Sequence, residues 1–81
     1  MVAVGITNKG KRLEFDCNTG ILLCSNRDLI SLELPEGVIN VWCSNNKLSE
    51  LTIPKSVTSL FCDKEVSGLE EFICKIYIYL W

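Results

Sequence analysis

Three cysteines stand nineteen residues apart, at Cys24, Cys43 and Cys62, and thiolates can bind metals or carry redox chemistry. The chain has no histidine and no C-x-x-C pair, so it lacks the usual ligand spacing of a zinc site. A free cysteine is also among the most buried residue types and packs as a small apolar side chain. We therefore predict that these thiols belong to the core, and we expect no metal and no cofactor. A thiol-based metal or redox protein is the weakest functional hypothesis.

The ten acidic residues are the second group that could do chemistry, because paired carboxylates can act as general acid and base. Glu70 and Glu71 are adjacent, and the other carboxylates are single. Acid–base catalysis needs a pocket that shifts the pKa of these groups, and a chain of 81 residues has little interior to provide one. There is also no glycine-rich phosphate loop. We predict that the protein is not an enzyme.

Composition limits the class of protein and its partners. The 81 residues are 48% apolar with a net charge of −2, which favours one folded domain over residues 1–81. The eight basic residues are scattered, which argues against nucleic acid, or allows single strands at most. No apolar run reaches the roughly 20 residues that span a bilayer, so we expect no membrane partner. An odd cysteine count without a signal-like N-terminus predicts a reducing cytoplasm, with that of a host cell as one alternative.

The spacing of nineteen extends well beyond the cysteines and indicates a repeat. Shifting the chain by nineteen superposes these sets: Leu22, Val41 and Leu60; Ser25, Ser44 and Asp63; Leu32 and Leu51; Leu34 and Ile53; Pro35 and Pro54; Val38 and Val57. A repeat of this length is typical of a solenoid whose equivalent side chains form columns. We predict parallel strands near 21–25, 40–44 and 59–63, with little or no helix.

The segment from Val38 to Leu48 resembles the strand motif L-x-x-L-x-L-x-x-N-x-L of the leucine-rich repeat family, in its short bacterial and viral form. The resemblance implies about three repeats over 19–72. It also implies that Asn46 satisfies backbone groups in the turn after the strand. In the third copy Glu65 stands at the asparagine position, so we expect that copy to be the least regular.

Both ends of such a stack need caps. Residues 1–18 read as a β-hairpin, with strands at 2–7 and 12–17 and Gly10 in the turn. Residues 73–81 are strongly β-prone and read as a capping strand, although Ile73, Ile76 and Ile78 could also begin a fourth repeat. The strand either closes its own sheet or pairs with a second copy, which gives a homodimer through Ile73–Trp81.

Period-two alternation turns Leu23, Trp42 and Phe61 to the outer face of the strands, and Tyr77 continues this row in our prediction. Tryptophan and tyrosine are enriched among residues that dominate binding energy. The predicted partner-binding residues are Leu23, Trp42, Phe61, Tyr77, Asn40, Ser44 and Asp63. The alternative is that the hairpin, the tail or a second copy covers this face.

These expectations converge on a mainly β, non-catalytic module that binds another protein and masks part of its surface. A small phage or mobile-element inhibitor of host machinery is one such protein, by analogy alone. The main alternative is a self-assembling structural protein that stacks through exposed ends.

Overall fold

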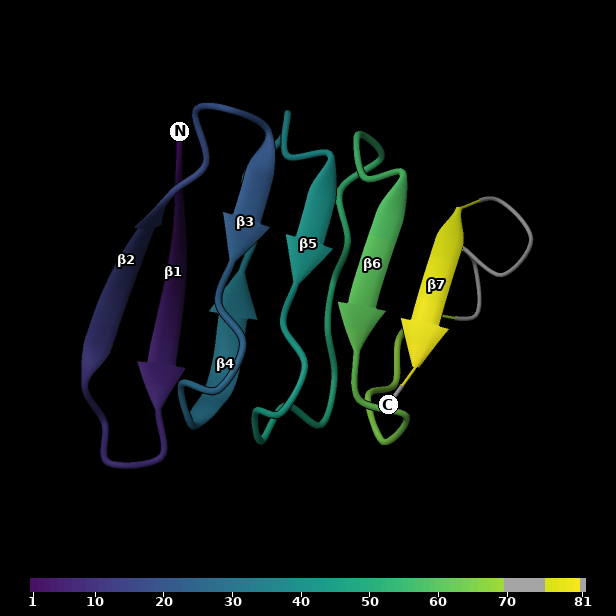
Figure 1. Ribbon diagram of the computed structural model, residues 1–81. Coiled ribbons are helices and arrows are strands. Elements are labelled where there is room, and N and C mark those ends of the chain that lie inside the picture. Colours follow the sequence, from purple (N-terminus) through teal and green to yellow (C-terminus); the bar gives the residue numbers. More distant parts are fainter. Residues whose placement is uncertain (70–75, 81) are drawn as a thin grey trace.

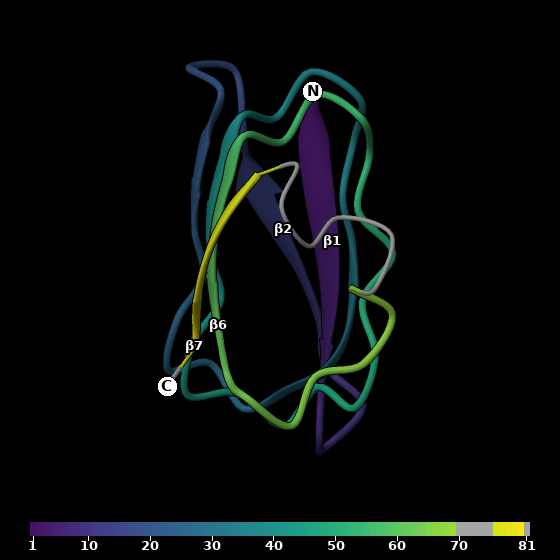
Figure 2. The same ribbon diagram turned by 90° about the vertical axis from the view of Figure 1, so that its right-hand side faces the viewer.

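The computed structural model describes residues 1–69 and 76–80, and these form two facing β-sheets (Figures 1 and 2). The described part of the chain is mainly β and contains no helix, as the sequence predicted. It follows that no helix within this part is long and apolar enough to cross a membrane.

One sheet is parallel and has four strands in the order β3-β5-β6-β7. The strands are β3 (Ile21–Leu23), β5 (Asn40–Trp42), β6 (Ser59–Cys62) and β7 (Tyr77–Leu80). The first three confirm the predicted parallel strands, and the pairing joins residues nineteen apart, such as Leu22, Val41 and Leu60. β7 pairs with β6, so this part of the tail closes its own sheet. The rest of the predicted 73–81 cap, residues 73–75 and 81, lies outside the described residues.

The second sheet is antiparallel, in the order β2-β1-β4, with β1 at Val2–Thr7, β2 at Arg12–Asp16 and β4 at Leu29–Glu33. The N-terminal hairpin is therefore confirmed, and Gly10 in its turn has φ of 82°. The sequence did not predict β4. This strand carries the chain back behind β3 and pairs with β1, so the hairpin extends the second sheet as well as closing one end of the molecule.

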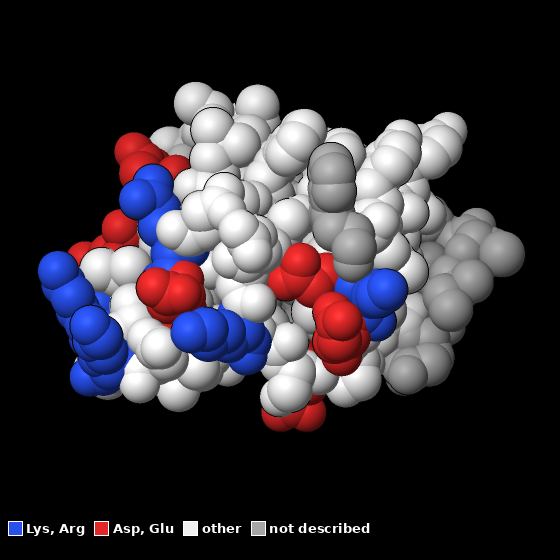
Figure 3. Space-filling view, turned by 60° about the horizontal axis from the view of Figure 1, so that its bottom comes forward, with Lys and Arg blue, Asp and Glu red and all other residues white. Residues whose placement is uncertain are grey.

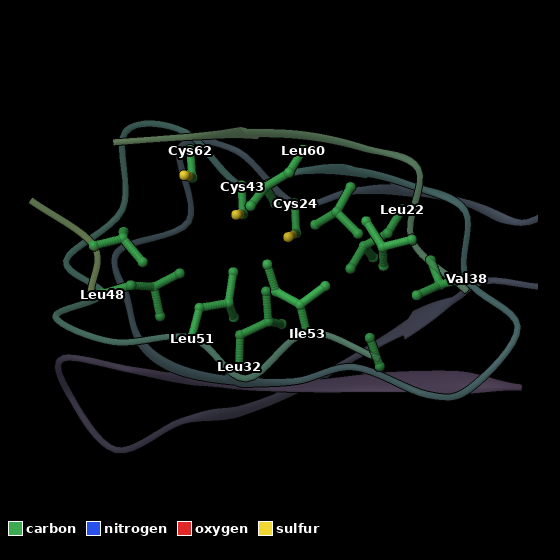
Figure 4. Close-up of a cluster of buried hydrophobic side chains, with 14 of the residues drawn as sticks. Leu22, Cys24, Leu32, Val38, Cys43, Leu48, Leu51, Ile53, Leu60 and Cys62 are labelled. Carbon is green, nitrogen blue, oxygen red and sulfur yellow. The ribbon is translucent and has the colours of Figure 1, made fainter. Parts of the chain in front are cut away.

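The core fills the space between the sheets, as Figure 4 shows. Leu22, Val41 and Leu60 are buried in one row of the parallel sheet, and Cys24, Cys43 and Cys62 are fully buried in the next. At the hairpin end, Ala3, Cys17 and Leu29 are completely buried, and Leu29 lies so close to Gly5 that a methyl group there would meet it. In the parallel sheet the inward positions are thus filled by the residues that alternation predicted, whereas the burial of Ala3, Cys17 and Leu29 was not predicted.

The turn after β5 is held by the side chain of Asn46. Its Oδ1 accepts hydrogen bonds from the backbone N–H groups of Arg27 at 2.9 Å and Leu29 at 3.2 Å. Its Nδ2 donates to the carbonyls of Cys24 and Cys43, at 2.9 and 3.0 Å. One amide therefore satisfies four backbone groups of two successive turns, which is the role predicted for it.

The corresponding task after β6 falls to Asp63 and not to Glu65. The Asp63 carboxylate accepts the backbone N–H groups of Asn45 at 2.8 Å and Asn46 at 3.1 Å. Glu65, which stands at the asparagine position of the repeat, is exposed. A carboxylate two residues earlier in the chain reaches the same kind of backbone donors, and its charge strengthens these hydrogen bonds.

Candidate functional site

The outer face of the parallel sheet carries a row of stacked aromatic rings. Strand pairing places Leu23 beside Trp42, Trp42 beside Phe61 and Phe61 beside Tyr79. The Trp42 and Phe61 rings stack with centroids 3.7 Å apart and planes 11° apart. The Phe61 and Tyr79 rings stack with centroids 4.5 Å apart and planes 8° apart. We call Leu23, Trp42, Phe61 and Tyr79 the aromatic row.

Tyr79, and not Tyr77, continues this row, which corrects the prediction from sequence. Tyr77 pairs with Ser59 and Tyr79 with Phe61, an offset of eighteen residues. The prediction put Tyr77 opposite Phe61, an offset of sixteen, because it aligned Ile76 and Ile78 with the repeat motif. The connection from β6 to β7 is therefore two residues longer than the prediction assumed. Tyr77 remains on the outer face and is 72% exposed.

Stacking decides which parts of the rings meet solvent. The strands run side by side and the rings lie face to face across them, so each inner ring face is covered by the next ring. The ring edges point away from the sheet. Trp42 is 39% exposed, and Leu23 at the end of the row is 64% exposed.

The described residues provide no cover for the aromatic row. The hairpin lies in the opposite sheet, and β7 extends the outer face instead of crossing it. Two of the three alternatives for covering Trp42, the hairpin and the described part of the tail, are therefore wrong. Coverage of the aromatic row by a second copy or by another protein stays a prediction.

A shallow groove of about 450 Å³ lies beside Trp42 of the row. It lies where the parallel strands end, and it is lined by Ser25, Asn26, Trp42, Ser44, Asn45 and Asp63. The Asn45 amide donates to the Asn26 side-chain carbonyl, and both residues have a left-handed backbone, with φ of 57° and 61°. The Ser44 hydroxyl oxygen is buried and has no hydrogen-bond partner among the described residues.

On the other side of the row, the Ser59 hydroxyl donates to the side-chain carbonyl of Asn40. The rows next to the aromatic row are therefore neutral apart from Asp63, and they contain the hydrogen-bonded pairs of Asn40 with Ser59 and of Asn26 with Asn45. Of the predicted site residues, the structure brings Leu23, Trp42, Phe61, Asn40, Ser44 and Asp63 together on or beside one face. Tyr77 lies on the same face, next to Ser59.

The cysteines stay in the core, away from this face. Burial raises the pKa of the Cys24 thiol to about 12 and that of Cys62 to about 11, and it also raises the pKa of Cys43 and Cys17. Such thiols are protonated near neutral pH, and the thiolate is the form that attacks or binds metal. Among the described residues no group of three or more His, Cys, Asp or Glu could hold a metal ion. Cys74, Glu70 and Glu71 lie outside those residues.

Charged side chains are mixed in sign over the surface. Figure 3 shows Lys and Arg side chains interspersed with Asp and Glu, without a large area of one charge on the face in view. Arg12 pairs with Glu14, and Lys47 lies 3.6 Å from Asp28; all four side chains are more than half exposed. Exposed ion pairs of this kind contribute little to stability.

Sequence reasoning missed three residues of this face: Asn26, Asn45 and Tyr79. Asn26 and Asn45 are nineteen apart, so the repeat itself carried a signal that their side chains lie together. Nothing comparable marked Tyr79, because its position depends on the length of the connection after β6.

Comparison of the chain with protein-family models, with curated proteins and with solved structures finds no match. The function must therefore be inferred from the face just described.

Proposed function

We propose that this chain is a non-catalytic protein-binding module, which masks a surface of another protein with the outer face of its parallel sheet. One observation carries the proposal: Trp42, Phe61 and Tyr79 form a continuous stack on that face, and Trp42 and Tyr79 keep 39% and 49% of their surface exposed. Large apolar side chains left in solvent mark interaction sites when they are contiguous.

Rigidity makes the row suited to this role. Each ring is fixed by its neighbour, so little side-chain entropy is lost when a partner covers the row. Tryptophan and tyrosine also provide most of the energy at many interfaces. The neutral rims, with Asn40 bonded to Ser59 on one side and Asn45 bonded to Asn26 on the other, suit the polar edge of a protein interface.

Single-stranded nucleic acid is the weaker candidate for the same face. Bases bind to aromatic side chains by stacking on exposed ring faces. Here the faces between Trp42 and Phe61 and between Phe61 and Tyr79 are already covered, and mainly edges are offered. The face in view in Figure 3 also has no basic track for a phosphate backbone among its described residues.

We further propose a short solenoid similar to leucine-rich repeats. The nineteen-residue offset of the strand pairing and the Asn46 hydrogen bonds between successive turns support this. A module that binds through one exposed face acts by occupying a site, as a small phage or mobile-element inhibitor does. Cys17, Cys24, Cys43 and Cys62 are free thiols, which fits a protein of the reducing cytoplasm. The raised pKa values of the buried thiols disfavour redox or metal chemistry at Cys24, Cys43 and Cys62.

The test is affinity capture from host lysate followed by direct binding measurements with the purified partner. Wild-type protein should retain one partner specifically, and Trp42→Ala should weaken its binding at least about tenfold, as expected for an interface hot spot. Leu23→Glu, which places a charge on the exposed end of the aromatic row, should have a similar effect.

The matched control is Ile30→Ala. Ile30 is 49% exposed on β4, in the opposite sheet, and it should leave partner binding unchanged. Equal binding by wild type, Trp42→Ala and Leu23→Glu, all folded by circular dichroism, would rule out the outer face. Loss of binding in Ile30→Ala alone would move the site to the second sheet.

A further inference from the structure

The last strand of the parallel sheet, β7, presents a sheet edge. β6 covers one side of β7, and no described residue pairs with the other side. The strand reads Tyr77-Ile78-Tyr79-Leu80 and carries no charge. Natural edge strands usually carry charges, proline or bulges that prevent pairing with other chains. β7 has none of these features.

The hydrogen-bonding groups of this edge can be assigned from the known pairing. Tyr77 donates its backbone N–H to the Thr58 carbonyl at 2.9 Å, so its peptide groups face β6. Along a strand these groups alternate in direction. The N–H and C=O groups of Ile78 and Leu80 therefore point to the outer edge.

Side-chain exposure gives a second sign that this end is incomplete. Ile78 and Leu80 point inward, in register with Leu60 and Cys62 of the core, yet Leu80 is 56% exposed. Leu60 and Cys62, one strand further in, are fully buried. Among the described strands, none covers the inner layer beyond β7.

The two ends of the molecule differ in charge, and this difference favours pairing of β7 with a second β7 over pairing of β7 with the hairpin end. At the other end the hairpin contacts β3, and its edge strand β2 carries Arg12, Glu14 and Asp16. Head-to-tail stacking would place the uncharged β7 against this charged end. Two β7 edges, in contrast, match each other and bring no like charges together.

We propose that two copies of the chain associate through β7 about a two-fold axis, with their β7 strands antiparallel in one continuous sheet. Because Ile78 and Leu80 supply the outward-pointing backbone groups, these two residues must face their counterparts in the second copy. Their side chains then cover one another on the inner side. Tyr77 and Tyr79 of both copies meet on the outer side, so the two aromatic rows lie on one face of the dimer. This dimer does not depend on the proposed function.

The first test is the molar mass of the full chain by light scattering across a concentration series. We expect a reversible transition from the 9.1 kDa chain to twice that mass and no further growth. A monomer at every concentration overturns the proposal. A mass that keeps rising also overturns it, because it indicates open stacking.

The second test removes one outward N–H. Leu80→Pro deletes the Leu80 donor but no hydrogen bond to β6, and Leu80→Ala is its matched control, since both lose the leucine side chain. The proline variant should dimerise at least about tenfold more weakly than the alanine variant. Equal dimerisation of the two folded variants contradicts the proposal.

Amide hydrogen exchange of the wild type gives a readout that needs no variant. Protection of the Ile78 and Leu80 amides should rise with protein concentration, whereas the Tyr77 amide, already bonded to Thr58, should not change. Protection of Ile78 and Leu80 that does not depend on concentration would show that the edge is not paired between copies.

Discussion

The rings of Trp42 and Phe61 stack face to face, with centroids 3.7 Å apart, although their residues are separated by nineteen positions in the chain. The parallel pairing of β5 with β6 produces this contact, because it sets residues nineteen apart side by side. The stack therefore stabilises the fold and also shapes the proposed binding face. Substitutions in the aromatic row must be separated into these two effects.

Phe61→Ala should destabilise the fold by about 2–3 kcal/mol, because Phe61 is the central ring and loses both stacking partners along with its half-buried surface. Urea denaturation followed by circular dichroism measures the change. Leu23→Ala is the control at the exposed end of the same row and should cost less than about 1 kcal/mol. Equal losses in the two variants would show that stacking contributes nothing beyond the apolar area.

Asn46→Ala should cost about 3 kcal/mol or more, because it leaves backbone groups of Arg27, Leu29, Cys24 and Cys43 without their partner. Thermal or urea unfolding measures this. Asn46→Asp keeps the two acceptor contacts and loses the two donor contacts, so its loss should also be large.

Lys47→Ala, next in the chain, is the control for Asn46. Its side chain is more than half exposed and makes only a 3.6 Å ion pair with Asp28, so its effect should stay within about 0.5 kcal/mol. A loss for Asn46→Ala no larger than that of Lys47→Ala would contradict the assigned role of the amide.

The repeat in the sequence was enough to predict the parallel strands and their inward columns, since one spacing governs both. There is a physical reason why β4 was not predicted from the sequence. Its pairing with β1 shifts register between Ile6 and Thr7, with Thr7 opposite Leu29 and Ile6 opposite Ser31, so Ile30 is an extra residue. Leu29 and Leu32 are both buried although they are three residues apart, and a period of two cannot show this.

The sequence predicted those residues of the candidate site that follow the nineteen-residue repeat. Trp42 and Phe61 follow from alternation within strands of fixed spacing, whereas Tyr79 depends on a connection whose length departs from nineteen. Asp63 was assigned to the rim from its position, but its hydrogen bonds to Asn45 and Asn46 could not be read from the motif, which places that task at Glu65.

The buried thiols should make stability fall at high pH. In the folded state burial raises the pKa of Cys62 to about 11 and of Cys24 to about 12, from an ordinary value of 9.0. Above pH 9 the unfolded chain therefore binds fewer protons, and the free energy of unfolding decreases as pH rises towards 11–12. Each such thiol contributes a slope of up to about 1.4 kcal/mol per pH unit.

Melting temperatures between pH 7 and 11 check this, with Cys24→Ala as the comparison. That variant should be less stable at pH 7, because a buried side chain is truncated, but its melting temperature should fall less steeply above pH 9. Parallel curves for the variant and the wild type would show that Cys24 ionises equally in both states.

Two glycines with similar backbone angles should respond differently to the same substitution. Gly68 has φ of 92° and Gly10 has φ of 82°, so alanine is strained at both. A Cβ at Gly68 would lie 2.8 Å from the Leu51 carbonyl oxygen, whereas a Cβ at Gly10 meets nothing within 4 Å. The Leu51 segment is also bonded through its N–H to the Ser67 carbonyl, at 3.0 Å, so it cannot retreat without breaking this contact.

Gly10→Ala should therefore cost about 1 kcal/mol, the penalty of a left-handed backbone alone. Gly68→Ala should cost clearly more, about 2–4 kcal/mol, because backbone strain and a backbone clash add. Urea unfolding of both variants compares them directly. Since the Gly68 turn leads from β6 back towards β7, the Gly68 variant should also speed exchange of the Tyr77 amide, and Gly10→Ala should not. Equal losses of unfolding free energy in the two variants would show that the Leu51 carbonyl can move away from the new Cβ at little cost.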